Sequence, residues 1–204
     1  MMSKTVKIII AVAVVIALVA ALVGFIGIKK SKPASNLSIN SVEDLTALVD
    51  QIYSGISIEM PMLQTMPLET TDVDMVKSFT GLDSATDIEY LVVSEPMMSS
   101  QAYSLVLVKV KDGVDADAVA KTMNENIDTR KWICVTAERV NTVASGDVVC
   151  LVMSNEETAN TVYESFKTLA GAVEQEYVRI EAEPELPEDM LIAPDDAETE
   201  VEVY

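Results

Sequence analysis

The stretch YSLVLVKV, residues 103–110, decides the fold because it is apolar on both of its alternating faces. Leu105 and Leu107 lie on one face of the expected strand, and Val106 and Val108 lie on the other. Strands that are apolar on both faces lie in the centre of a sheet and are covered on both sides. We therefore expect a central strand here.

A strand and a helix flank this stretch. DIEYLVVS, residues 87–94, has the alternation of a strand, and residues 114–130 place apolar side chains on one face of a helix. The same order then recurs. ERVNTV and DVVCLVM flank the hairpin signal ASG at 144–146, and a helix follows that begins at the capping box SNEE, residues 154–157, and ends at Gly171.

This pattern predicts an α+β domain at residues 41–173, an antiparallel sheet of four to five strands with packed helices, built as two tandem strand-strand-helix units. A helix that starts at SVED, residues 41–44, should cover part of one face, and the two unit helices should cover the other. Residues 56–86 show little regular pattern, although TDVDMVKSF fits a short helix that ends at Gly81.

An uncharged stretch of 21 residues, 8–28, precedes this domain. As a helix it is about 31 Å long, which matches the hydrocarbon core of a bilayer. A cleaved signal peptide is the alternative, but lysines occupy positions 29, 30 and 32, where small residues normally precede a cleavage site. We therefore expect a transmembrane signal anchor at 8–28, a cytoplasmic N-terminus at 1–7 and a linker at 29–40. The lysines on the two sides nearly balance, so charge alone leaves the orientation open.

Acidic residues dominate the rest of the chain. Residues 33–204 carry 9 basic and 33 acidic side chains, a charge that polyanions repel, which excludes nucleic acid as a partner. The absence of histidine removes the usual zinc ligand and the usual general base at neutral pH. Residues 174–204 hold twelve of the acids without sustained periodicity, and we predict that they form a disordered tail.

No motif of known catalytic chemistry is present. The seven glycines are explained by the membrane stretch or by the ends of elements, and there is no GxSxG elbow. Paired carboxylates could form a hydrolase site, which composition alone does not exclude. We therefore assign no catalytic, cofactor-binding or metal-binding residues, and the sequence leaves open whether the chain is an enzyme.

Three groups of residues have both a chemical and a structural interpretation. Asp112, Asp115 and Asp117 could bind calcium, but they lack the spacing of an EF-hand and fit the start of a helix better. Cys134 and Cys150 have apolar neighbours and are interpreted as buried free thiols, with a disulfide as the alternative. Five methionines could bind Cu(I), but without an adjacent histidine or cysteine they fit flexible packing in loops better. They are Met60, Met62, Met66, Met97 and Met98.

The connection EPMMSSQ, residues 95–101, joins the strand at 87–94 to the central strand. At seven residues it is longer than a tight hairpin needs, whereas the hairpin of the second unit closes in about three. Excess length of this kind favours an exposed functional loop. The candidate interaction loop consists of Pro96, Met97, Met98, Ser99, Ser100 and Gln101.

The stretch from residue 87 to residue 132, followed by a hairpin and a terminal helix, resembles the bacterial domain-of-unknown-function family 4358. The likeness covers roughly residues 60–170 and includes the polar loop, the strand that closes on KVKD and the helix that ends at Arg130. The resemblance implies a small domain behind a lipoprotein signal or a membrane anchor, and it supplies no catalytic residues. It also implies export, so we expect the N-terminus inside and the domain outside.

These observations favour a membrane-anchored, extracytoplasmic domain that binds or scaffolds another component of the cell envelope without catalysis. The expected contacts are the membrane, through residues 8–28, and an envelope protein. An envelope-polymer hydrolase that uses paired carboxylates and a cation-binding module are the alternatives.

Overall fold

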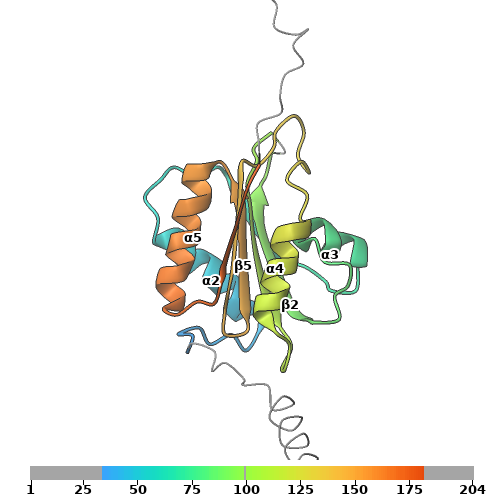
Figure 1. The fold of residues 1–204 in the computed structure, drawn as a ribbon. Helices are drawn as coiled ribbons and strands as arrows, with labels where there is room; N and C mark the ends of the chain where they lie inside the picture. Colours follow the sequence, from blue (N-terminus) through green and yellow to red (C-terminus); the bar gives the residue numbers. More distant parts are fainter. Residues whose placement is uncertain (1–33, 99, 182–204) are drawn as a thin grey trace, which may run out of the picture. The chain divides into compact units, whose positions relative to one another are not determined.

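Two strands, β3 (Ser104–Val110) and β5 (Val148–Ser154), lie side by side at the centre of an antiparallel sheet (Figure 1). The computed structural model describes residues 34–98 and 100–181. Every residue of β3 and β5 is buried, as expected for central strands that are covered on both faces. The other strands are β1 (Leu63–Pro67), β2 (Ile88–Pro96), β4 (Arg139–Ser145) and β6 (Glu176–Ile180), and the order across the sheet is β1-β2-β3-β5-β4-β6.

The predicted α+β class and antiparallel sheet are confirmed, but the sheet has six strands rather than four or five. Two edge strands account for the difference. β1 lies where the sequence shows little regular pattern, and β6 occupies residues that we assigned to the tail. Neither strand contains a buried residue, because an edge strand borders solvent. Both therefore lack the apolar run by which the central strands can be recognised.

Helices cover both faces of the sheet (Figure 1). Two of them, α2 (Val42–Ser54) and α5 (Glu156–Ala170), pack on one face, and α3 (Val73–Thr80) and α4 (Ala116–Asn126) pack on the other. The expectation that both unit helices, α4 and α5, share one face is therefore wrong. Each face of β3 and β5 carries apolar side chains, so each face needs a helix that excludes water from it.

The chain order β2-β3-α4 followed by β4-β5-α5 is the predicted tandem of strand-strand-helix units. The N-cap of α5 differs by one residue from the predicted capping box. The side chain of Asn155, not that of Ser154, accepts the backbone N–H of Thr158 at 2.9 Å. Ser154 still pairs within the sheet, and its hydroxyl donates to the carbonyl of Ala102 at 2.8 Å. A single residue therefore separates β5 from α5.

Residues 34–40, which we assigned to the linker, pack against the domain. The backbone N–H of Asn36 donates to the carbonyl of Ala170 at 2.9 Å, and the hydroxyl of Ser145 donates to that of Ser35 at 2.8 Å. Apolar side chains of this segment also pack against the core beneath α2 and α5. The ordered domain therefore includes the second half of the predicted linker.

The expected membrane anchor at 8–28 and the N-terminus at 1–7 lie outside the described residues, and so does the tail from residue 182 onward. Within the described part of the chain, no helix combines the length and the apolar character that crossing a bilayer requires. The anchor stays a prediction from the sequence.

Gly81 lies where α3 meets the end of α4. It caps α3 with a φ of 73°, and its N–H donates to the carbonyl of Lys77 at 2.8 Å. A Cβ at this position would lie 2.6 Å from the backbone nitrogen of Ile127, which follows α4. Gly113 has a comparable φ of 83°, but no atom lies within 4 Å of a Cβ placed there. A side chain at Gly81 would therefore meet both a steric clash and a left-handed backbone, whereas a side chain at Gly113 would meet the left-handed backbone alone.

We expect Gly81→Ala to lower the free energy of unfolding by about 3 kcal/mol, because it adds a backbone clash to left-handed strain. Gly113→Ala is the matched control and should cost about 1 kcal/mol, from the left-handed conformation alone. Urea denaturation of the full chain, followed by circular dichroism, measures both losses. Equal losses would show that α3 does not pack against the end of α4 as described.

Candidate functional site

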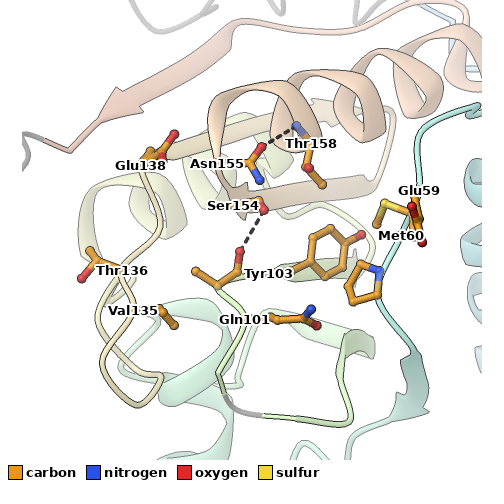
Figure 2. A pocket seen from close by; sticks show the side chains of 12 residues that line it. Glu59, Met60, Gln101, Tyr103, Val135, Thr136, Glu138, Ser154, Asn155 and Thr158 are labelled. Atoms are coloured by element: carbon orange, nitrogen blue, oxygen red, sulfur yellow. Dashed lines mark hydrogen bonds between the residues drawn. The ribbon is translucent and has the colours of Figure 1, made fainter.

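A cleft of about 510 Å³ opens at one end of the sheet (Figure 2). In the antiparallel register, the ends of β2 and β5 meet the starts of β1, β3 and β4 at this end. The cleft is therefore lined by connections rather than by strand interiors. Its lining residues are Glu59, Met60, Pro61, Gln101, Ala102, Tyr103, Val135, Thr136, Glu138, Ser154, Asn155 and Thr158.

Tyr103 and Ser154 lie between the two walls of the cleft (Figure 2). The hydroxyl of Tyr103 is hydrogen-bonded to that of Tyr53 on α2 at 2.8 Å. Burial raises the pKa of Tyr53 to about 12 and raises the pKa of Tyr103 well above its ordinary value. Both hydroxyls are therefore neutral at physiological pH. Their contact fixes this part of the cleft to α2.

The first turn of α5 forms part of the lining, and protein groups already cap it. Asn155 accepts the N–H of Thr158, and the carboxylate of Glu138 accepts the N–H of Glu156 at 3.2 Å. Arg139 also pairs with the Glu156 carboxylate at 2.7 Å. A helix N-terminus attracts anions through its N–H groups, but here the side chains of the chain itself take up two of them.

The charge of the cleft is negative. Two of its lining residues, Glu59 and Glu138, are acidic, and no lysine or arginine is among the residues that line it. The two carboxylates come from opposite walls: Glu59 stands with Met60 on one side, and Glu138 stands near Thr136 on the other (Figure 2). A ligand in this cleft would therefore meet hydroxyl, amide and carboxylate groups. Such a lining favours polar or cationic ligands over anions.

Lys131 fixes the loop that supplies Val135 and Thr136. Its ammonium forms an ion pair with Glu95 at the end of β2, and only 12% and 21% of the two side chains is exposed. The Lys131 Nζ also donates to the Ser104 hydroxyl at 3.4 Å and lies 4.4 Å from the centroid of the Phe79 ring. Burial lowers the pKa of Lys131, and the carboxylate of Glu95 opposes that change. The ion pair thereby attaches this wall of the cleft to the sheet.

The candidate interaction loop occupies the same end of the sheet. β2 extends through Glu95 and Pro96, because these residues pair with Gln64 and Leu63 of β1, and β3 begins at Ser104, so the connection consists of residues 97–103 rather than 95–101. Within this loop Met97, Met98, Ser100 and Gln101 are exposed, Pro96 is partly buried, and Ser99 lies outside the described residues. Of the six predicted residues, Gln101 lines the cleft.

The other connections that line the cleft were missed by sequence reasoning. They are the segment 59–61 before β1, the segment 135–138 before β4 and the start of α5. The long connection 95–101 was the one signal that pointed to this end. Successive antiparallel strands run in opposite directions, so the order of the strands could have predicted that the remaining connections lie at this end of the sheet. This inference failed because β1 was not recognised as a strand.

The two cysteines differ in burial, and two of the three aspartates lie at the start of α4. Cys134 is exposed with a φ of 60°, whereas Cys150 is buried, and both are free. The prediction of a buried thiol is therefore wrong for Cys134, because its apolar neighbours form a surface loop, and the alternative of a disulfide is not realised. Burial raises the pKa of the Cys150 thiol. Asp115 caps α4 and Asp117 accepts the hydroxyl of Tyr177 at 3.0 Å, in agreement with their interpretation as helix-start residues.

The methionines divide into two groups. Met66 packs against the core and Met60 lines the cleft, whereas Met62, Met97 and Met98 are exposed. Among the described residues, no three or more histidine, cysteine, aspartate or glutamate side chains form a group suited to a metal ion.

We expect Glu95→Gln to destabilise the domain by about 2 kcal/mol, because it leaves a largely buried ammonium without its carboxylate. Amide hydrogen exchange in residues 131–137 should become faster as the loop detaches. The control is Glu89→Gln, since Lys109 keeps its second carboxylate partner, Asp147, at 2.7 Å. Unchanged exchange in Glu95→Gln would show that the ion pair does not hold this wall.

Comparison with known proteins supplies a family. The model of a family described as a domain of unknown function, DUF4358, matches residues 62–154, which begin just before β1 and end with β5. Three of the four lining segments have residues within this match. No curated protein and no solved structure matches the chain. The resemblance inferred from the sequence is confirmed for residues 62–154, which match the model of the DUF4358 family.

Proposed function

We propose that this chain is a membrane-anchored, extracytoplasmic domain that binds another component of the cell envelope and does not catalyse a reaction. The observation that carries this proposal is the cleft of about 510 Å³, into which four connections bring polar side chains. Its volume lies within the range of small-molecule and side-chain binding sites. A cleft of this kind can recognise a ligand through several hydrogen bonds while the sheet stays unchanged.

The geometry supports binding over hydrolysis. Two carboxylates that cleave a polymer need a converging arrangement in which at least one acid is poorly solvated. Glu59 and Glu138 are both exposed, and Glu138 already caps α5. The hydroxyl of Tyr103 is engaged with Tyr53, and that of Ser154 donates to a backbone carbonyl. The cleft therefore presents exposed side chains such as Glu59 and Gln101 for recognition, rather than a converging pair of poorly solvated acids.

The location outside the membrane rests on the sequence. The uncharged residues 8–28 are long enough to span a bilayer, and the family resemblance implies export. A tether of this kind keeps the domain close to the membrane surface. It thereby raises the local concentration of the domain for partners in the envelope.

Photo-cross-linking in intact cells tests the proposal. We expect p-benzoylphenylalanine placed at Gln101, which lines the cleft, to give a reproducible adduct with an envelope component. The matched control is the same amino acid at Ala118, an exposed position on α4, on the opposite face of the sheet from α5 (Figure 1). Adducts of equal yield from both positions, or none from Gln101, would contradict the proposal.

A further inference from the structure

Exposed apolar side chains are concentrated around the cleft. Eight large apolar side chains of the described residues are strongly exposed, and four of them lie in segments that form or adjoin the cleft. These four are Met62, Met97, Met98 and Ile133, with exposed fractions of 76, 62, 69 and 67%. Single exposed apolar residues need no explanation, but several in adjoining connections indicate an interaction surface.

The chain places these side chains on both sides of the cleft. Met62 directly follows the lining residue Pro61, and the backbone N–H of Met97 donates to the carbonyl of Met62 at 3.0 Å. These residues adjoin one wall. Ile133 lies two residues before Val135, within the loop that supplies the opposite wall. We use the term methionine rim for Met62, Met97 and Met98.

The chemistry of this rim suits a partner peptide. Methionine side chains are flexible and polarizable, so a methionine-rich surface adapts to apolar side chains of different shape. The adjoining cleft carries Glu59 and Glu138 without a cation among its lining residues. A segment that presents apolar side chains together with lysine or arginine would complement both features.

We infer that the cleft and the methionine rim together bind a basic, amphipathic peptide segment of a partner protein. A lysine or arginine of the segment enters the cleft near Glu59 and Glu138, and its apolar residues cover the rim. The inference rests on the proposed binding function and specifies the class of partner. Two other occupants fit less well, because an anionic lipid surface and a second copy of this acidic chain would both be repelled.

Peptide binding by the full chain, held in nanodiscs of phosphatidylcholine, tests this inference. The probe is a short fluorescein-labelled helical peptide of leucine and lysine, and its counterpart has glutamate in place of each lysine. Fluorescence anisotropy, after subtraction of the signal from empty nanodiscs, should show binding of the basic peptide alone. Its affinity should fall as the salt concentration rises, because salt screens the charge attraction.

Variants then locate the binding site. Glu59→Gln combined with Glu138→Gln should weaken binding of the basic peptide about tenfold. Met62→Gln combined with Met97→Gln and Met98→Gln should also weaken it about tenfold, because the apolar contacts are lost. The matched control is Val73→Gln combined with Met75→Gln, which changes two exposed apolar side chains of α3 and should leave the affinity unchanged.

The outcomes separate this inference from the proposed function. Equal binding of the two peptides, or equal affinity in all variants, would overturn the basic-peptide inference. If Gln101 cross-links to an envelope component while the basic peptide does not bind, the binding function stands and the class of partner is wrong. If neither is observed, both are wrong.

Discussion

The complete burial of β3 and β5 is the constraint on which the rest of this structure depends. Both strands are apolar on both faces, so the fold needs α2 and α5 on one side and α3 and α4 on the other. The two helical layers cover the faces of the sheet and leave the ends of the strands to the connections. Polar side chains therefore gather at an end of the sheet, where they can remain hydrated without disturbing the core.

The connections at this end are held by a few polar contacts. The Lys131–Glu95 ion pair attaches one wall to β2. The hydroxyl of Ser154 donates a hydrogen bond to the carbonyl of Ala102, shortly before β3. The hydrogen bond between Tyr53 and Tyr103 links the cleft to α2. Each contact is partly or fully shielded from water, where electrostatic interactions are stronger than at an open surface. The positions of the walls are thus set by the core, while Glu59, Gln101 and the methionine rim remain exposed for recognition.

The sequence predicts the elements whose pattern is dictated by burial and misses those that border solvent. The apolar runs at 103–110 and 147–153 and the periodicity of α4 and α5 identify the central layers, because these elements face the core directly. β1 and β6 have no buried residue, so their positions follow from pairing rather than from their own pattern. The cleft was found only in part: the length of the connection before β3 pointed to Gln101, but the approach of Glu59 and Glu138 from distant segments is a tertiary effect. The apolar neighbours of Cys134 predicted that its thiol is buried, but the exposure of this loop is also set by tertiary structure.

Amide hydrogen exchange of the full chain, with and without the saturating leucine–lysine peptide, tests the central claim that recognition takes place at this end of the sheet. We expect slower exchange on binding in the segments around residues 59–62, 97–103 and 133–138. Exchange in α3 should not change. Protection of α3, with none in the connections that line the cleft, would contradict this claim.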